Sequence, residues 1–357
     1  MKNRIESIDG LRGVAITLVI LFHTFYHSIS ITPWLTGLEG IWVVKYGFLG
    51  VELFFLISGF LIYKSIETCK SLGEFLLKRW LRLFPAMLVA TILIFSTSYF
   101  LSERPNGIPK LVDCLPGLLF VHPYFFEKFF TIKTVPFEWA YWSLFVEVIF
   151  YVIFGISYFA NKKNAVNALL ILFLLSILYR LLEFMNLANI LLIKKLVDGS
   201  FIYFGWFYVG CIQYRDRKEN IEKINIKSLI ILLSSSIATV GFNWEGIIFC
   251  LLIYLIFCNW ILNTKKNLLI NNPVFVNLGV ISYPLYLIHE NAILALSIKT
   301  RYFFPDMWNF VNPIPGLIII LLTAMVITKF CEPAMKKLII RLLGFIKADL
   351  APEKHTS

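Results

Sequence analysis

Long apolar runs separated by short charged segments make up almost the whole of this sequence. A helix needs about 20 mostly apolar residues to cross the hydrocarbon core of a bilayer, and runs of this kind recur along the chain. Only 15% of the 357 residues are charged, compared with about 25% in a typical soluble domain. The sequence therefore predicts an all-α bundle of helices that crosses a membrane many times, with almost no soluble domain.

The apolar runs predict about ten membrane-spanning helices. The first run follows two basic residues, as in a signal peptide, but it lacks a small-residue cleavage site and is expected to remain as the first helix. The predicted organisation is a membrane domain over residues 1–340 and a short tail over residues 341–357. The predicted spans are 11–31, 47–66, 82–102, 139–160, 166–186, 199–214, 228–242, 245–262, 274–297 and 314–335.

Lysine and arginine concentrate in every second connecting segment, beginning with the N-terminal one. Because such segments stay on the cytoplasmic side, and because the predicted number of spans is even, both termini are expected in the cytoplasm. The same bias explains the net charge of +11 without nucleic acid as a partner. The cysteines form no C-x-x-C pair, so no metal is expected.

The longest connection lies on the predicted external side, over residues 103–138. It is rich in proline and phenylalanine, which an unstructured external loop would not need. We expect it to fold back onto the membrane surface and to cover part of an external cavity.

An ionisable side chain inside a bilayer is costly and marks a candidate functional site. Arg12 and His23 are separated by about 16 Å along a helix, and half the hydrocarbon thickness is about 15 Å. If Arg12 lies at the cytoplasmic headgroups, His23 lies near the midplane. Burial there favours the neutral imidazole, which is a competent general base. The alternative is a histidine that only makes a hydrogen bond inside the bundle.

Arg79 and Arg82 lie three residues apart and share one face of the predicted helix boundary. Paired guanidinium groups can bind phosphate groups through two parallel hydrogen bonds. The alternative is that they only anchor the cytoplasmic end of the helix.

Three further stretches contain polar residues inside apolar runs. The glycines of 47–62, with Ser58, predict close approach between helices. Glu147 lies in a strongly apolar segment and needs a partner there, and His289 with its neighbouring carboxylate follows a proline-interrupted helix. Arg180 and Glu183, three residues apart, are expected to neutralise each other.

Five ordered stretches together resemble the acyltransferase-3 family of bacterial membrane acyltransferases. The resemblance covers nearly the whole chain, and its order and spacing make it specific. The matching stretches are Arg12 with His23, the segment GVELFFLISGFLI, Arg79-x-x-Arg82 followed by Pro85, Trp142-Ser143-Leu144 ending in Glu147, and ISYPLYLIHE, with Glu332-Pro333 similar to the closing helix.

The resemblance implies a multi-pass O-acyltransferase of the bacterial cytoplasmic membrane. Members transfer an acyl group, usually acetyl, from a coenzyme A thioester to a hydroxyl of a surface carbohydrate. The implied partners are the lipid bilayer, acyl-CoA as donor and a carbohydrate or lipid-linked sugar as acceptor. Val148 stands where the family often has a second carboxylate. The chain also lacks the esterase-like domain of some members, so acceptor delivery is expected to rely on the membrane domain or on another protein.

The resemblance also suggests roles for individual residues. Arg12, Arg79 and Arg82 would bind the phosphates of acyl-CoA. His23 would act as the general base, and Glu147 would orient it or stabilise its imidazolium. Ser58, Ser143 and Tyr283 are the alternatives for the group that stabilises the oxyanion. His289 either lines the acceptor side or only makes a hydrogen bond to a neighbouring helix. Direct transfer and an acyl-histidine intermediate both remain open.

A transporter or exporter without catalysis is the competing hypothesis. Helices interrupted by proline and glycine, with ionisable groups near the midplane, would suit one. Transport does not require a cytoplasmic Arg-x-x-Arg paired with a midplane histidine, and no inverted repeat is visible. The enzyme is therefore favoured.

Overall fold

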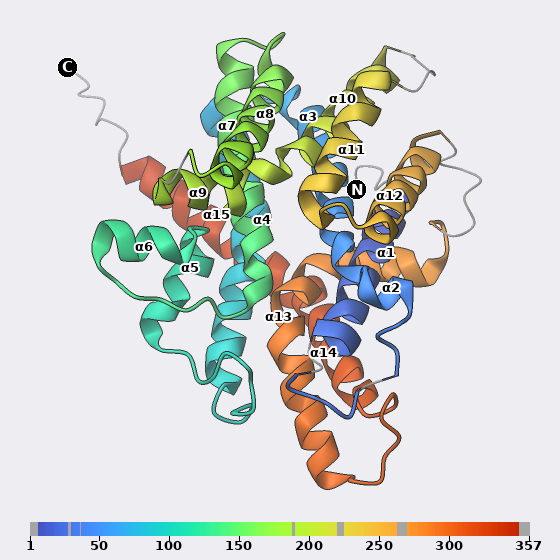
Figure 1. Cartoon of the computed structure of the whole chain (residues 1–357). Helices are drawn as coiled ribbons and strands as arrows, with labels where there is room; N and C mark the ends of the chain where they lie inside the picture. Colours follow the sequence, from blue (N-terminus) through green and yellow to red (C-terminus); the bar gives the residue numbers. More distant parts are fainter. Residues whose placement is uncertain are drawn as a thin grey trace, which may run out of the picture.

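The computed structural model describes residues 6–27, 30–35, 37–187, 190–219, 225–262 and 270–349. Within these residues, helices are the only regular structure (Figure 1). The prediction of an all-α bundle is therefore confirmed. The last residues of the predicted tail, 350–357, lie outside the described residues.

Each of the ten predicted ranges contains a helix. These helices are α1 (Glu6–Phe22), which continues as the π-helical turn η1 (His23–His27), α3 (Gly50–Ile66), α4 (Leu72–Thr97), α7 (Trp142–Ala160), α8 (Ala165–Phe184), α10 (Phe204–Lys218), α11 (Ile226–Val240), α12 (Trp244–Leu262), α13 (Pro273–Phe303) and α14 (Ile314–Val326). The chain runs on from α14 through η6 (Ile327–Cys331) into α15 (Glu332–Asp349). Shorter helical pieces in the connections are α2 (Trp42–Lys45), η2 (Gly47–Leu49), η3 (Leu111–Asp113), α5 (Cys114–Leu119), α6 (Pro123–Phe130), η4 (Trp139–Tyr141), α9 (Leu191–Gly199) and η5 (Phe201–Tyr203).

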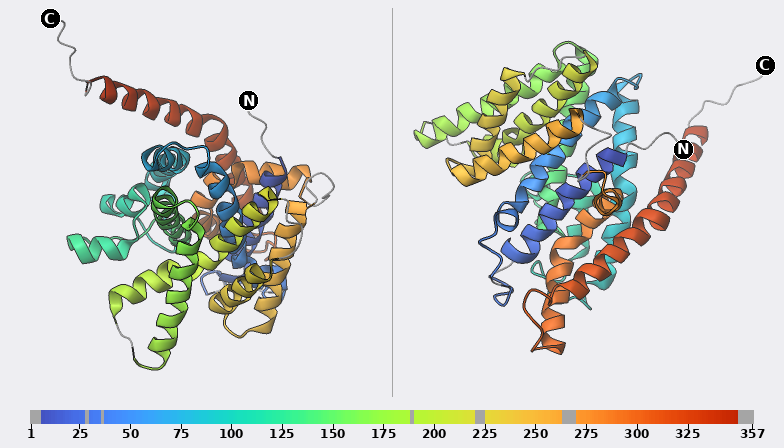
Figure 2. Two further views of the ribbon diagram at one scale, coloured as in Figure 1. Left: turned by 90° about the horizontal axis from the view of Figure 1, so that it is seen from above. Right: turned by 90° about the vertical axis from the view of Figure 1, so that its right-hand side faces the viewer.

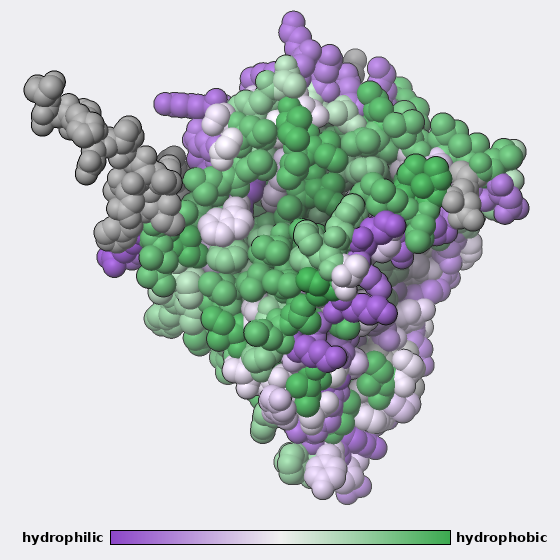
Figure 3. Space-filling model, turned by 90° about the vertical axis from the view of Figure 1, so that its left-hand side faces the viewer, coloured by the Kyte–Doolittle hydropathy of each residue, from purple (hydrophilic) through white to green (hydrophobic). Residues whose placement is uncertain are grey.

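Seven helical stretches within the described residues are long and apolar enough to cross a membrane. The protein is therefore a multi-pass membrane protein, and Figure 3 shows apolar side chains over a broad part of one face. That α10, α11 and α13 also cross stays a prediction. The seven stretches are Ser7–His27, Gly47–Ile66, Leu72–Thr97, Trp139–Ala160, Ala165–Phe184, Trp244–Leu262 and Ile314–Gly344.

Close packing between helices at the centre of the bundle depends on glycine. A Cβ atom on Gly59 of α3 would overlap the carbonyl oxygen of Phe207 in α10, and one on Gly279 of α13 would overlap that of Asp9 in α1. The prediction that α3 approaches its neighbours closely is thus confirmed. Helices α1, α3, α10 and α13 form the middle of the molecule, and the two further views show the others packed around them (Figure 2).

Several helices extend beyond the ranges expected from hydropathy, and α4, α13 and α15 matter most for the site. Helix α4 begins at Leu72, where the Ser71 side chain accepts a hydrogen bond from the backbone N–H of Glu74 and so caps the helix. Arg79 and Arg82 therefore lie inside α4 rather than at its start. Helix α13 continues through Pro284, and α15 continues to Asp349, which makes the first residues of the predicted tail helical.

The connection 103–138 contains the short helices α5 and α6, which lie beside α4 in Figure 1. Its base is attached to α13. The backbone N–H of Asn106 donates to the side-chain oxygen of Asn291 at 3.1 Å, and the buried guanidinium of Arg104 pairs with Glu138 at 3.3 Å. Phe129 and Phe130 are exposed, as expected for a segment that meets lipid. That the connection covers an external cavity stays a prediction.

The expected pairing of Arg180 with Glu183 is wrong. Arg180 donates to the Asp198 carboxylate at 3.0 Å and to the carbonyl of Ala238 at 3.0 Å, while Glu183 pairs with Lys194. The short helix α9 lies against α8. It carries Asp198, the partner of Arg180, and Lys194, the partner of Glu183. Spacing along one helix could not reveal partners that come from another element.

Candidate active site

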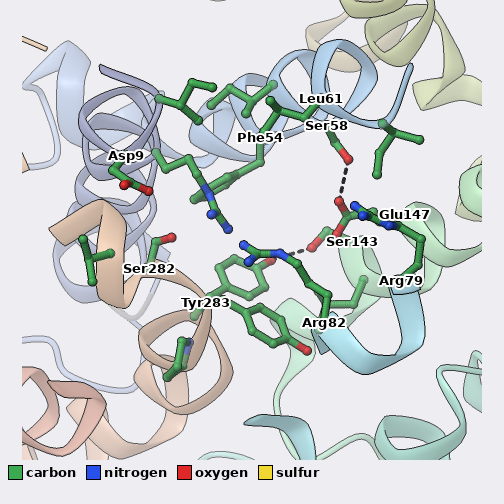
Figure 4. Close-up of a pocket in the computed structure, with 18 of the residues that line it drawn as sticks. Asp9, Phe54, Ser58, Leu61, Arg79, Arg82, Ser143, Glu147, Ser282 and Tyr283 are labelled. Atoms are coloured by element: carbon green, nitrogen blue, oxygen red, sulfur yellow. Dashed lines mark hydrogen bonds between the residues drawn. The ribbon is translucent and has the colours of Figure 1, made fainter. Parts of the chain in front are cut away.

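A cavity of about 790 Å³ lies between α1, α3, α4, α7, α13 and the junction of η6 with α15 (Figure 4). This volume lies within the usual range of small-molecule sites. Most of the residues predicted for the site line this one cavity, although they come from five separate predicted spans. They are Arg12, Ser58, Arg79, Arg82, Ser143, Glu147 and Tyr283.

The guanidinium groups of the cavity make few hydrogen bonds within the described parts of the chain. Arg79 donates from Nη2 to the Ser65 hydroxyl at 2.9 Å, but its buried Nε has no hydrogen-bond partner among the described residues. Arg82 points into the cavity in Figure 4. Arg12 lies near Arg82 and also near the carboxylates of Asp9 and Glu147. A buried unpaired donor and adjacent like charges favour the binding of an anion.

Glu147 provides negative charge beside Arg79 in the cavity (Figure 4). Its carboxylate accepts a short hydrogen bond of 2.6 Å from the Ser58 hydroxyl on α3 (Figure 4). This contact supplies the partner that an intramembrane carboxylate needs. It joins Glu147 to the wall of the cavity, whereas the carboxylate nearest to His23 in the structure is Glu290.

Hydroxyl groups of α7 and α13 line the inner part of the cavity. Ser143 and Tyr286 hydrogen bond to each other at 2.7 Å, and the Tyr286 hydroxyl donates to the carbonyl of Ala140 at 2.7 Å. The Tyr283 hydroxyl instead donates to the backbone carbonyl of Leu83 at 3.0 Å. Ser143 and Tyr286 are therefore the hydroxyls that lie together at this end of the cavity.

A cluster of His23, His289 and Glu290 lies beside this inner end. His23 Nδ1 is 3.2 Å from His289 Nε2, and His23 Nε2 is 3.8 Å from Glu290 Oε1. The Tyr286 ring joins the cluster to the cavity, because it lines the cavity and its centroid is 5.4 Å from that of His289. We call these three residues the histidine cluster.

The hydrogen bonds of the cluster define which imidazole nitrogens carry protons. His23 Nδ1 contacts the Val19 carbonyl at 3.0 Å, and His289 Nδ1 contacts the Tyr286 carbonyl at 2.9 Å. A carbonyl only accepts, so both Nδ1 atoms donate when the rings are neutral. The single Nδ1–H of His23 is then shared between the Val19 carbonyl and His289 Nε2. His23 Nε2 keeps a free lone pair, and it faces the Glu290 carboxylate.

Local backbone structure holds both sides of this cluster. The helix of the first span widens into the π-turn η1 at His23, a feature that often occurs at functional sites. Glu290 is held from α7, because the backbone N–H of Ala140 donates to its Oε2 at 2.8 Å. The next residue, Asn291, donates to the buried Glu138 carboxylate at 2.7 Å. Glu138 and Arg104 thus support the cluster from behind.

Most of the site residues predicted from the sequence line the cavity, but part of the histidine cluster was not predicted. His23 and His289 contact each other outside the cavity lining, and Glu290 and Tyr286 were not singled out for a role. A signal for them was present in ISYPLYLIHE, where Tyr286 and Glu290 are four residues apart and share one helix face. Their contact with His23 depends on how α1 packs on α13, which one helix alone does not show.

The fold and the site together define the class of protein. A multi-pass helical membrane protein with a cation-lined cavity, whose inner end lies beside a histidine–carboxylate pair, has the parts of a membrane-embedded group-transfer enzyme. Residues 5–329 match the family model described as "Acyltransferase domain". The chain therefore belongs to the acyltransferase-3 family.

Similar proteins carry related names. The chain is 27% identical over 231 residues to the O-acetyltransferase OatA of Staphylococcus aureus, covering 58% of this chain and 34% of that protein. It is 30% identical over 167 residues to another Staphylococcus aureus protein, named "Putative O-acetyltransferase", with 43% of this chain and 24% of that protein covered. The match thus spans about a quarter of that relative's length. No solved structure matches the chain.

Proposed function

We propose that this protein is an O-acyltransferase of the bacterial cytoplasmic membrane. It moves an acyl group, with acetyl expected, from cytoplasmic acyl-CoA to a hydroxyl of a surface carbohydrate or lipid-linked sugar. The single observation that carries the proposal is the position of the histidine cluster, which lies beside the inner end of the arginine-containing cavity and is joined to it by the Tyr286 ring.

The donor binds with its phosphates at the arginine end of the cavity. Arg79 offers its unpaired Nε, and Arg12 and Arg82 add positive charge that a polyanion neutralises. Lys336 of α15 also lines the cavity. The acyl-pantetheine arm then extends between the helices toward Ser143 and Tyr286. This arrangement supports a thioester donor that carries several negative charges.

The acceptor hydroxyl is activated by His23. His23 Nε2 takes the hydroxyl proton while the hydroxyl oxygen forms a bond to the thioester carbonyl carbon. The carbon–sulfur bond of the tetrahedral intermediate then breaks, and the thiolate of CoA leaves with the electron pair and takes the proton back from His23. General-base catalysis of this kind contributes about 10²- to 10⁴-fold in rate. This route is direct transfer, without an acyl-histidine intermediate.

Charge formed during this reaction has partners nearby. The Glu290 carboxylate, 3.8 Å from His23 Nε2, stabilises the imidazolium while the intermediate exists. We assign this role to Glu290 in place of Glu147. The Ser143 hydroxyl lies at the inner end of the cavity, and its proton turns from Tyr286 or the Ala140 carbonyl to the oxyanion when the intermediate forms. Such a donor is worth about 10²- to 10³-fold in rate.

The experiment that tests the proposal follows labelled acetyl-CoA. Membranes of a bacterium that expresses the protein receive acetyl-CoA labelled in the acetyl group, and label is measured in the lipid-linked sugar and polysaccharide fractions. The proposal expects label in one of these fractions with wild type and background label with His23→Ala at equal protein level. Equal label for both proteins contradicts the role of His23. Export of an unmodified sugar without acetyl-CoA consumption would favour the transporter.

A further inference from the structure

A second cavity, of about 400 Å³, lies on the other side of α3 from the candidate active site. Helices α1, α3, α10 and α12 form it. Its walls combine apolar and aromatic side chains with cationic ones. The lining residues are Ile8, Phe60, Lys64, Tyr214, Arg217, Lys218 and Trp260.

The charges around this cavity are mostly positive. Lys218 is held by the Glu67 carboxylate at 2.8 Å, and Tyr214 donates to the same carboxylate at 2.8 Å. Lys64 and Arg217 make no ion pair within the described parts of the chain. Three of the described residues that line the cavity are cationic and none of them is acidic, and Glu67 pairs with only one of the three, Lys218.

A buried donor lies in the same cavity without a partner. The Trp260 side chain is 1% exposed, and its Nε1 has no hydrogen-bond partner among the described residues. An indole N–H only donates, so an occupant that satisfies it must carry an acceptor atom. This observation is independent of the cations and points to the same kind of ligand, one with negatively charged oxygens.

We propose that this cavity binds the phosphate-bearing headgroup of an anionic membrane lipid. Lys64 and Arg217 neutralise the phosphate, and Trp260 Nε1 donates to one of its oxygens. The apolar wall of Phe60 and Trp260 suits the glycerol and upper acyl region. Leu255, which precedes Trp260 on α12 and lies toward the membrane centre, is exposed and lets the acyl chains continue along the lipid-facing side. Basic pockets between membrane helices bind lipid headgroups in this way.

The position of this cavity connects it physically to the active-site cavity. Lys64 directly precedes Ser65, which accepts the hydrogen bond from Arg79, and Ile8 lines both cavities. A headgroup bound at Lys64 therefore supports the turn of α3 that positions Arg79. The lipid-binding proposal does not depend on the proposed acyltransferase activity.

The test measures lipid binding rather than activity. Wild-type protein purified in detergent is mixed with phosphatidylglycerol or phosphatidylcholine, and retained lipid is counted by native mass spectrometry. The variants are the double change Lys64→Gln with Arg217→Gln, and Trp260→Phe, which keeps an aromatic ring but removes the N–H. Lys163→Gln, at the exposed turn between α7 and α8, is the matched control. Monodisperse elution confirms that each variant folds.

The proposal expects wild type and Lys163→Gln to retain phosphatidylglycerol in preference to phosphatidylcholine. Each removed cation should weaken retention about fivefold, and Trp260→Phe should weaken it less. Equal retention by the double variant and wild type overturns the site. In a separate arm, inorganic phosphate is added and the melting temperature is followed. Stabilisation by phosphate that needs Lys64 and Arg217, without retention of phosphatidylglycerol, overturns the lipid as the occupant.

Discussion

The active-site cavity and the histidine cluster lie side by side but are built in opposite ways. In the cavity, the buried Nε of Arg79 lacks a hydrogen-bond partner among the described residues. In the cluster, each imidazole Nδ1 already contacts a backbone carbonyl, and Glu290 is held by a backbone N–H of α7. The cavity thus gains hydrogen bonds when an anion enters, whereas the cluster is complete before anything binds.

The difference indicates that donor binding and the chemical step depend on two separate groups of residues in the same bundle. A buried hydrogen-bond donor without a partner costs free energy. A negatively charged ligand that accepts from such donors removes this cost, so its binding is favoured. Fixed dipoles and charges around a reacting group lower a barrier because they need no reorganisation during the reaction. Substitutions in the cavity should therefore change affinity, and substitutions in the cluster should change the rate of the chemical step.

The largest effect is expected for His23→Ala. Removal of the general base should lower kcat about 10²- to 10⁴-fold with little change in KM for acetyl-CoA. Steady-state kinetics in detergent or nanodiscs measure both parameters. Lys163→Gln, at the exposed turn between α7 and α8, is the control and should stay within about threefold of wild type, a change below 1 kcal/mol.

A smaller loss is expected for Glu290→Gln, which keeps the shape of the side chain but removes its charge. The Glu290 carboxylate faces the imidazolium at 3.8 Å, and loss of this electrostatic stabilisation should lower kcat about 10- to 100-fold, less than loss of a direct hydrogen-bond donor. Glu147→Gln is the matched comparison and should lower kcat less, because Glu147 bonds Ser58 on the cavity wall. A greater fall in kcat with Glu147→Gln than with Glu290→Gln would indicate that Glu147, and not Glu290, stabilises the imidazolium.

A change in affinity rather than rate is expected for Arg82→Ala. Loss of one charge-assisted contact to a phosphate should raise KM for acetyl-CoA about 10-fold, with kcat near the wild-type value. Arg82→Lys should recover only part of the affinity, because an ammonium group cannot bind a phosphate through a planar fork. A fall in kcat at unchanged KM would place Arg82 in the chemistry instead.

The smallest effect is expected far from both regions, at Arg180→Ala. Its ion pair with Asp198 is partly exposed, and such pairs contribute about 0.2–1 kcal/mol to stability. The melting temperature of the detergent-purified protein should drop by only a few degrees, with acetyl-CoA kinetics unchanged. A large loss of activity in well-folded protein would show that the comparison between the two regions omits part of the site.

The fold and the cavity could be predicted from the sequence to a large extent. Apolar runs located a helix in each predicted range, and motif spacing found residues such as Arg12, Arg79 and Glu147 that line one cavity. These features are local, because they depend on hydropathy and on residue type at fixed spacing. The family assignment was also confirmed.

Contacts between distant helices could not be predicted in the same way. The pairing of His23 with His289 and Glu290 requires the packing of α1 on α13, and the partners of Arg180 come from α9 and α11. The early start of α4 follows from the Ser71 cap rather than from hydropathy. The π-turn at His23 depends on tertiary packing and left no signal in the sequence pattern.

The most direct test of the separation between binding and chemistry is the equilibrium binding of acetyl-CoA to His23→Ala, measured by isothermal titration calorimetry beside wild type and Arg82→Ala. The account predicts that His23→Ala binds acetyl-CoA within about threefold of wild type, a difference below 1 kcal/mol, although it does not turn the donor over. Arg82→Ala should bind about 10-fold more weakly. Loss of binding in His23→Ala with normal binding in Arg82→Ala would contradict the account.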